Sequence, residues 1–116
     1  MIEKNIKIIS RGGIVYFNQK EIKYYSERYK KWVLVPLNYR SDGATGAIDI
    51  NTDAWWVHDK LCDSGVFDDK SPCTNWQASM ILRDILRRDN YYARATTWFI
   101  STWLFGGGKC RSNGMW

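Results

Sequence analysis

Residues 74–88 read TNWQASMILRDILRR, and this stretch decides the fold. Thr74 is a favourable N-cap residue, and the apolar side chains behind it recur at the spacing of one helix face. These side chains are Ala78, Ile81, Leu82 and Ile85. Arginines gather toward the other end, where the helix dipole favours cations. The pattern predicts a helix from Thr74 to about Arg88 with one buried face.

Further helices are predicted on both sides of this one. Asn51 or Thr52 can cap a helix that runs to about Ser64, and Gly65 stops it. A third helix is predicted from about Tyr91 to Phe105. Its inner stripe is expected to consist of Tyr92, Ala95, Phe99 and Trp103. Residues 106–116 are glycine-rich and basic, and we expect a mobile tail there.

The first 41 residues have the pattern of strands. Four short segments rich in β-branched and aromatic residues are separated by polar or glycine-containing turns, at 5–9, 13–17, 21–25 and 32–35. This spacing suits an antiparallel meander. The predicted fold is therefore a single α+β domain over residues 1–105, with an N-terminal antiparallel meander packed on about three C-terminal helices.

Length and charge limit the classes of function. The chain has 116 residues, enough for one domain and too few for two. It lacks both a signal-peptide pattern and an apolar run of about 20 residues, so we expect a soluble protein with no membrane span. Lys and Arg exceed acids by six over residues 1–41 and by five over 70–116, whereas acids exceed Lys by six over 42–69. An acidic middle in a basic protein fits a cation site, and it equally fits aspartates in loops and helix caps.

The acidic middle contains the only histidine, in the sequence WWVHDKLC over residues 55–62. On a helix, His58 faces the same side as Leu61 and Cys62, and Asp59 lies about 100° round. A half-buried imidazole can act as a general base, and the neighbouring carboxylate can bind Ca²⁺ or another divalent cation. The structural alternative is a core histidine bonded to a backbone carbonyl, with Asp59 at the rim.

Other features of the sequence have both a functional and a structural interpretation. Asp42 in the turn SDGAT could reach His58 or share its cation, or it could form an Asx-turn that ends a strand. Asp49, Asn51 and Asp53 have the spacing that opens a calcium loop, but the later positions of that loop do not match. The three cysteines are expected to be reduced, with spacings that fit no zinc motif.

Two surfaces are candidates for binding partners. Seven tryptophans exceed the need of a small core, so Trp55, Trp56 and the terminal Trp116 are candidate contacts for a protein partner. The Lys-rich strands with Tyr24, Tyr25, Tyr29 and Trp32 could form a basic, aromatic platform for nucleic acid, or simply a solvated sheet face.

Three segments together resemble a domain-of-unknown-function family of small tailed-phage and prophage proteins. They are VP at 35–36 with SDGAT at 41–45, VHDKLCDSG at 57–65, and the amphipathic helix that follows. The family pattern has a threonine-aspartate-glycine-alanine-serine turn and a later histidine-aspartate-x-leucine-tyrosine helix. The resemblance covers about residues 5–105 and implies that Asp42, His58 and Asp59 form the site. The chain departs from the pattern at Cys62, which replaces the tyrosine, and it lacks the family's proline after the turn.

Over a few residues, the His-Asp helix is also similar to that of secreted phospholipases. That likeness implies His58 as base and Asp59 as calcium ligand, with an aspartate on the facing helix to orient the histidine. Gln77 stands at the facing position here, so His58 and Gln77 are the candidate catalytic pair. The glutamine carbonyl can hold the imidazole, but an amide cannot stabilise an imidazolium by charge. The disulfide scaffold and calcium loop of those enzymes are missing from the sequence.

The leading hypothesis is a phage-type accessory protein that acts by protein–protein binding. It would be a virion, tail, lysis-region or host-interaction component, located in the bacterial cytoplasm or in the virion, with a phage or host protein as its partner. A second hypothesis is a cation-assisted hydrolase of an ester or amide that uses His58 and Asp59. A third is nucleic-acid binding through the Lys-rich sheet.

Overall fold

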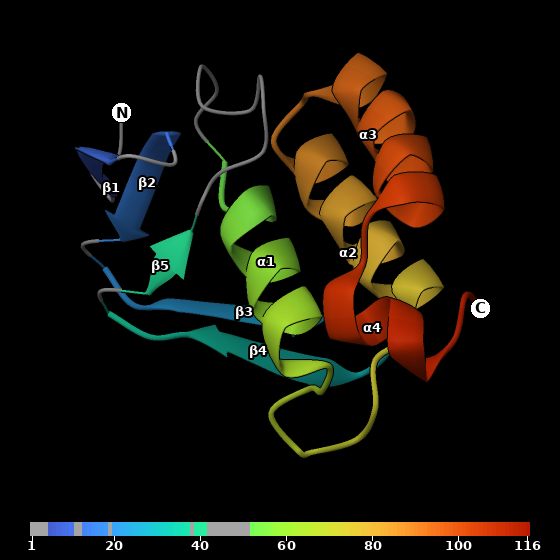
Figure 1. The fold of residues 1–116 in the computed structure, drawn as a ribbon. Coiled ribbons are helices and arrows are strands. Elements are labelled where there is room, and N and C mark those ends of the chain that lie inside the picture. The colour runs from blue at the N-terminus through green and yellow to red at the C-terminus, as the bar shows by residue number, and fades with distance from the viewer. Residues whose placement is uncertain (1–4, 11–12, 19, 38, 42–51) are drawn as a thin grey trace.

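The structure is a computed structural model that describes residues 5–10, 13–18, 20–37, 39–41 and 52–116. Antiparallel strands come first and helices follow, so the α+β prediction is confirmed (Figure 1). The strands are β1 (Asn5–Ser10), β2 (Gly13–Asn18), β3 (Ile22–Ser26), β4 (Lys31–Val35) and β5 (Arg40–Ser41). The helices are α1 (Ala54–Ser64), α2 (Asn75–Arg88), α3 (Tyr92–Phe105) and α4 (Gly108–Asn113).

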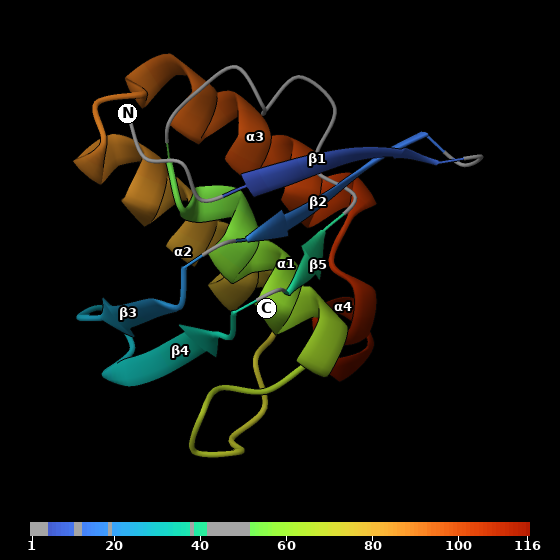
Figure 2. The ribbon, with the colours of Figure 1, turned by 90° about the vertical axis from the view of Figure 1, so that its left-hand side faces the viewer.

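The strands form two sheets rather than one continuous meander. β1 pairs antiparallel with β2, and the second edge of β2 pairs with β5. Because β5 occupies that edge, β3 pairs only with β4, in a separate hairpin. Figure 2 shows the hairpin lying apart from the β1–β2–β5 sheet. The predicted antiparallel pairing of successive strands therefore holds for β1–β2 and β3–β4, and the order changes between these pairs.

The β3–β4 hairpin has one core face and one outer face, as alternation along a strand requires. Ile22, Val33 and Val35 are buried on the core face, and β4 packs against α1. Tyr25 and Trp32 are opposite each other on the outer face, with ring centroids 5.0 Å apart. The hairpin thus seals one side of the helical core and leaves an aromatic pair facing outward.

Helix α2 forms the centre of the helical layer and contacts α1, α3 and α4. Its N-terminus is a capping box: the Gln77 N–H donates to the Thr74 hydroxyl, and the Thr74 N–H donates to the Gln77 side-chain oxygen. The predicted apolar face is fully buried, at Ala78, Ile81, Leu82 and Ile85. Figure 1 shows α2 between α1 and α3.

Helix α1 begins and ends close to the predicted residues. The Thr52 hydroxyl accepts a hydrogen bond from the Ala54 N–H, and Asn51 lies outside the described residues. Gly65 adopts a left-handed conformation with φ 73° and donates its N–H to the Leu61 carbonyl. This is the glycine stop expected from the sequence.

Helix α3 exposes more of its predicted inner stripe than expected. Ala95 is buried, but Tyr92 is 56% exposed, and Tyr91 and Trp98 pack on the core in its place. The tight turn from α2 explains the shift: Asn90 has φ 71°, and the Tyr91 N–H bonds to the Leu86 carbonyl. The turn directs Tyr91 inward and so rotates the buried stripe by about one residue, or 100° of helix.

Residues 106–116 are ordered by contacts, which corrects the expectation of a mobile tail. They contain α4, which packs on α1 and α2 and buries Cys110. The Asn75 N–H donates to the Gly114 carbonyl, and the Trp103 indole N–H donates to the Met115 carbonyl. Glycine-rich composition alone could not reveal these contacts, because their partners lie far away in the sequence. In the part of the chain that the structure describes, no helix combines the length and the apolar character needed to cross a bilayer.

The turn into α4 provides a stability test. Gly107 has φ 116°, and a Cβ there would lie 2.2 Å from the Asn75 side-chain oxygen. We expect Gly107→Ala to lower the free energy of unfolding by about 3 kcal/mol, from backbone strain and overpacking. Gly106→Ala is the control without a left-handed φ; its Cβ would lie 3.1 Å from the Thr102 carbonyl oxygen, so we expect a smaller loss, of about 1 kcal/mol. Urea unfolding of both variants measures the difference, and equal losses would contradict this account of the turn.

Candidate functional site

His58 lies in the middle of α1 and is 5% exposed. The Trp55 ring stands edge-on to it, with centroids 6.1 Å apart. Burial disfavours the charged imidazolium and lowers the pKa of His58 to about 4. The imidazole is therefore neutral near pH 7 and can accept a proton from a neighbouring group.

Asp59 is the nearest carboxylate in the described part of the chain, with 4.0 Å between its Oδ1 and His58 Nδ1. Since the imidazole is neutral, this contact carries little ion-pair energy near pH 7. Farther along the same rim of α1, the Tyr39 hydroxyl donates to Asp63 at 2.9 Å. Burial and the Asp63 carboxylate both raise the pKa of Tyr39, so the phenol keeps its proton.

The predicted cation site lies only partly within the described residues. Asp42, Asp49 and Asn51 lie outside them, so the pairing of Asp42 with His58 stays a prediction. Within the described residues, no three His, Cys, Asp or Glu side chains form a group that could hold a metal ion. Of the predicted metal ligands, the structure thus places only Asp59 and Asp53, which is the N-cap residue of α1.

Gln77 has a structural partner. Its side-chain oxygen accepts the Thr74 N–H at 2.9 Å, and in the described residues it makes no hydrogen bond to His58. The capping box S/T-x-x-E/Q is a sequence signal, and Thr74 with Gln77 matches it directly. The structure therefore does not bring together the two residues chosen as a catalytic pair.

The side chain that does contact His58 is Cys62, whose sulfur lies 3.5 Å from Nε2 and 3.8 Å from Nδ1. The thiols of Cys62 and Cys73 both interact with that of Cys110, whose S–H donates to the Leu61 carbonyl at 3.1 Å. The three thiols of the chain and its single imidazole thus meet at the junction of α1, α4 and the start of α2. The helical spacing of His58 and Cys62 signals the contact between these two, but no spacing signals the approach of Cys73 and Cys110, which the fold brings in from distant positions.

The three thiols differ in acidity. The hydrogen bond to Cys110 and burial raise the pKa of Cys62, and the same causes raise that of Cys73. Hydrogen bonds from these two thiols lower the pKa of Cys110, while the contact of its S–H with the Leu61 carbonyl at 3.1 Å opposes ionisation. Cys110 is therefore the thiol of the three that loses its proton most readily.

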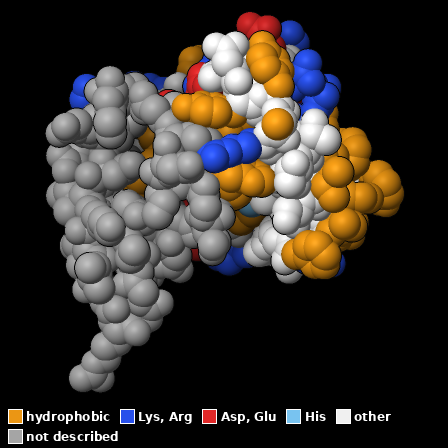
Figure 3. Space-filling view, turned by 90° about the horizontal axis from the view of Figure 1, so that it is seen from above, with side chains coloured by type: hydrophobic (Ala, Val, Ile, Leu, Met, Phe, Trp, Pro, Cys, Tyr) orange, Lys and Arg blue, Asp and Glu red, His pale blue; other side chains and the backbone are white. Residues whose placement is uncertain are grey.

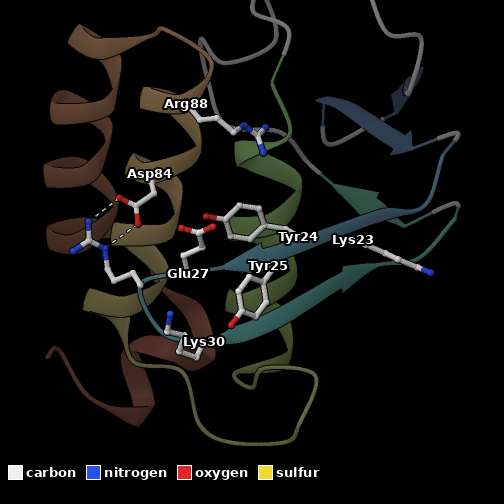
Figure 4. A pocket seen from close by; sticks show the side chains of 8 residues that line it. Lys23, Tyr24, Tyr25, Glu27, Lys30, Asp84 and Arg88 are labelled. Carbon is white, nitrogen blue, oxygen red and sulfur yellow. Dashed lines mark hydrogen bonds and ion pairs between the residues drawn. The ribbon is translucent and has the colours of Figure 1, made fainter.

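A separate cleft of about 750 Å³ opens between α2 and the β3–β4 hairpin (Figure 4). It is lined by Lys23, Tyr24, Tyr25, Glu27, Arg28, Lys30, Asp84 and Arg88. Arg28 donates two hydrogen bonds to Asp84, at 2.9 and 3.0 Å, which joins the hairpin to α2 across the cleft. The ion pair between Arg28 and Asp84 thus forms part of the cleft wall, and Lys23 and Lys30 also line the cleft.

The predicted partner tryptophans occupy three different environments. Trp56 is buried in the core, and Trp55 packs on Trp98 with centroids 4.8 Å apart. Trp116 is 75% exposed, although one edge of its ring rests on Trp76 and Trp103. Only Trp116 presents a large surface to a partner.

Trp116 belongs to a larger apolar surface that the sequence did not indicate. We call it the apolar cap: the exposed side chains of Ile100, Leu104, Phe105 and Trp116, over the partly buried Trp76, Phe99 and Trp103. Figure 3 shows hydrophobic side chains gathered at the edge of the molecule opposite the grey N-terminal part. Exposed apolar groups of this size commonly mark an interaction site.

Burial of His58 predicts a pH dependence of stability. The imidazole has a pKa of 6.5 when unfolded and about 4 when folded, so the unfolded chain binds the extra proton first. The free energy of unfolding should therefore fall by about 3 kcal/mol as the pH falls from 6.5 to 4. Urea titrations of the wild type and of His58→Asn across this range isolate the contribution. Equal slopes for the two proteins would contradict a buried neutral histidine.

Similarity to known proteins does not resolve the function. No known family model matches the chain, and no curated protein or solved structure shows significant similarity to it. The resemblance to the phage family thus stays a prediction. The features of the structure that bear on function are the apolar cap, the thiol junction formed by Cys62, Cys73 and Cys110, and the β3–β4 hairpin.

Proposed function

We propose that the chain is a small accessory protein that acts by docking to a partner protein through the apolar cap. One observation carries the proposal: α3 is the most apolar of the three long helices, yet Ala95 is its only fully buried residue. A helix that faces only water on its outer side is expected to be polar there. The outer side of α3 instead exposes three large apolar side chains near its C-terminal end, Ile100, Leu104 and Phe105.

The aromatic support of the apolar cap suits a binding role. Trp76 contacts Phe99 and Trp103 edge-on, with centroids 5.0 and 5.5 Å from its own. Trp116 packs on the indoles of Trp76 and Trp103. The Trp103 indole is further fixed by its bond to the Met115 carbonyl. Tryptophans held in this way lose little conformational entropy on binding, which favours them as energetic anchors.

The charges around the apolar cap indicate the chemistry of the partner. Arg94 lies over Trp98, Arg87 lies over Tyr92, and Arg111 donates to the carbonyl groups at the end of α3. Residues 75–116 carry six Lys or Arg against two Asp. Asp84 and Asp89 each accept hydrogen bonds from an arginine. An apolar surface with basic flanks fits an amphipathic helix that has acidic flanks.

The identity of the partner is part of the proposal. The resemblance to small tailed-phage proteins points to a virion, tail, lysis-region or host-interaction component, so the partner would be a phage or host protein. The hydrolase alternative has less support, because His58 is only 5% exposed. A residue that acts on a substrate must reach it.

A synthetic helical peptide tests the docking surface. The probe has a leucine stripe flanked by glutamates, and its counterpart flanked by lysines is the charge control. We expect the glutamate peptide to bind the wild type, and Leu104→Asp to weaken binding at least about tenfold. Leu37→Asp, an exposed leucine after β4 and outside the apolar cap, makes the same substitution and should change binding little. Calorimetric titration gives the affinities. Equal binding of both peptides, or no effect of Leu104→Asp, would contradict the proposal.

The hairpin supports a second candidate function, the binding of single-stranded nucleic acid. Tyr25 and Trp32 pair on its exposed face, and Lys23 lies two residues from Tyr25 on the same face of β3. Exposed aromatic rings next to cations can stack bases and contact phosphates. Of the three tyrosines in the predicted platform, however, only Tyr25 is exposed, because Tyr24 and Tyr29 pack toward the core.

A labelled oligonucleotide separates this candidate from a merely solvated sheet. If the hairpin binds, Trp32→Ala should weaken affinity for oligo-dT about tenfold, in line with about 1–3 kcal/mol for one stacked base. Affinity should also fall as salt rises, because bound counterions are released. Leu37→Ala, likewise exposed but outside the strands, is the control. Fluorescence anisotropy that finds no binding at low salt would exclude this candidate.

A further inference from the structure

We infer that the junction of α1 and α4 is an oxidation site, at which a peroxide converts Cys62 and Cys110 into a disulfide that fastens α4 to α1. All three cysteines are free thiols in the structure, and the inference is independent of the docking proposal. It rests on three observations: the convergence of the thiols, the unequal exposure of the three cysteine residues, and the contact of Cys62 with His58.

The backbone around the thiols brings the two segments very close. A Cβ added at Gly108 would lie 2.7 Å from the Cys62 carbonyl oxygen and 3.4 Å from the Cys62 Cβ. Such an approach is open only to glycine, whose φ here is also left-handed at 48°. Cys110 follows two residues later, with its sulfur 3.1 Å from the carbonyl of Leu61, the residue before Cys62. The two cysteines thus sit on segments in direct contact.

A second set of bonds holds the junction in register. The Asn113 side-chain amide donates to the Gly65 carbonyl at 2.7 Å and to the Cys73 carbonyl at 2.9 Å. The Cys73 N–H donates to the same Gly65 carbonyl at 3.0 Å. The end of α1, the loop before α2, and α4 are therefore tied together beside the sulfurs.

Cys110 can hydrogen-bond either of two thiols, and exposure selects Cys62 as its bridging partner. Cys73 and Cys110 are fully buried, whereas Cys62 is partly exposed. A small oxidant therefore meets the Cys62 sulfur first. Cys62 also has a hydrogen-bond partner within reach, since Nε2 of the His58 imidazole lies 3.5 Å from its sulfur. The Cys73 thiol faces the Thr74 carbonyl instead, at 3.5 Å.

The chemistry takes two steps and consumes one hydrogen peroxide. The Cys62 sulfur attacks one peroxide oxygen as its proton moves to His58; the O–O bond breaks, and the departing hydroxide takes that proton and leaves as water. Cys62 is now a sulfenic acid. Cys110 then attacks the Cys62 sulfur, the S–S bond forms, and the S–O bond breaks. The hydroxide leaves as a second water with the Cys110 proton, so two thiols are oxidised and the peroxide is reduced.

The role of Cys110 in the second step fits its environment. Hydrogen bonds from Cys62 and Cys73 lower its pKa, and the thiolate is the nucleophile in disulfide formation. The resulting bridge would join α1 to the segment that carries Met115 and Trp116. Oxidation would thereby fasten the C-terminal residues of the described fold.

Peptide mapping of the full chain tests the inference without any substitution. The reduced protein is treated with an equimolar amount of hydrogen peroxide, alkylated and digested without reductant. Cleavage after Lys60, Lys70 and Lys109 places the three cysteines on separate peptides. We expect a linked pair containing Cys62 and Cys110, a protein mass lower by two hydrogen atoms, and an alkylated Cys73. The melting temperature should rise by several degrees and return on reduction, because the bridge constrains the unfolded chain.

Matched variants separate the proposed pair from other outcomes. Cys73→Ser should retain the bridge, whereas Cys62→Ser and Cys110→Ala should each abolish it. His58→Asn should slow bridge formation, and raising the pH should restore part of the rate, because hydroxide replaces the lost acceptor. A wild-type link between Cys73 and Cys110, links only between molecules, or sulfinic acids without a disulfide would each overturn the inference.

Discussion

The arrangement of the helices depends on the hydrogen bonds at the start of α2. Thr74 and Gln77 satisfy each other's backbone groups there and fix where the helix begins. Asn75, which follows Thr74, binds the C-terminal part of the chain. Its N–H donates to the Gly114 carbonyl, and its side chain donates to the Trp103 carbonyl at 2.6 Å. One helical turn thus sets the position of α3 and α4 as well as of α2. The apolar cap and the thiol junction both follow from it.

Local signals in the sequence predicted the elements that are decided locally. The apolar spacing of α2, the stop at Gly65 and the strand alternation each gave correct elements, because each depends on neighbours within a few residues. Predictions that depend on distant contacts fared worse. The division into two sheets depends on β5 reaching the edge of β2, and the order in residues 106–116 depends on bonds to Asn75, Gly65 and Cys73.

The candidate site likewise has features that helical geometry predicts and features that depend on distant residues. His58 was correctly expected to face the core side of its helix, because helical geometry alone fixes that. Its chemical role depends on the side chains that it contacts. Cys62 contacts the imidazole, whereas Gln77 bonds to Thr74. A His-Asp pair in a sequence suggests an ionised couple. Burial reverses this expectation, since it keeps the imidazole neutral and leaves Asp59 as a rim carboxylate.

The stacked indoles of Trp76, Trp103 and Trp116 have an optical consequence. Their ring centroids lie 5.0 to 5.5 Å apart, close enough for the excited states of the three rings to couple. The near-ultraviolet circular dichroism and fluorescence of the chain are therefore dominated by a cluster built from α2, α3 and the residues behind α4. Any event that loosens that last segment would change the colour and polarisation of the emitted light without an added label. The protein therefore carries an intrinsic fluorescent reporter in the apolar cap.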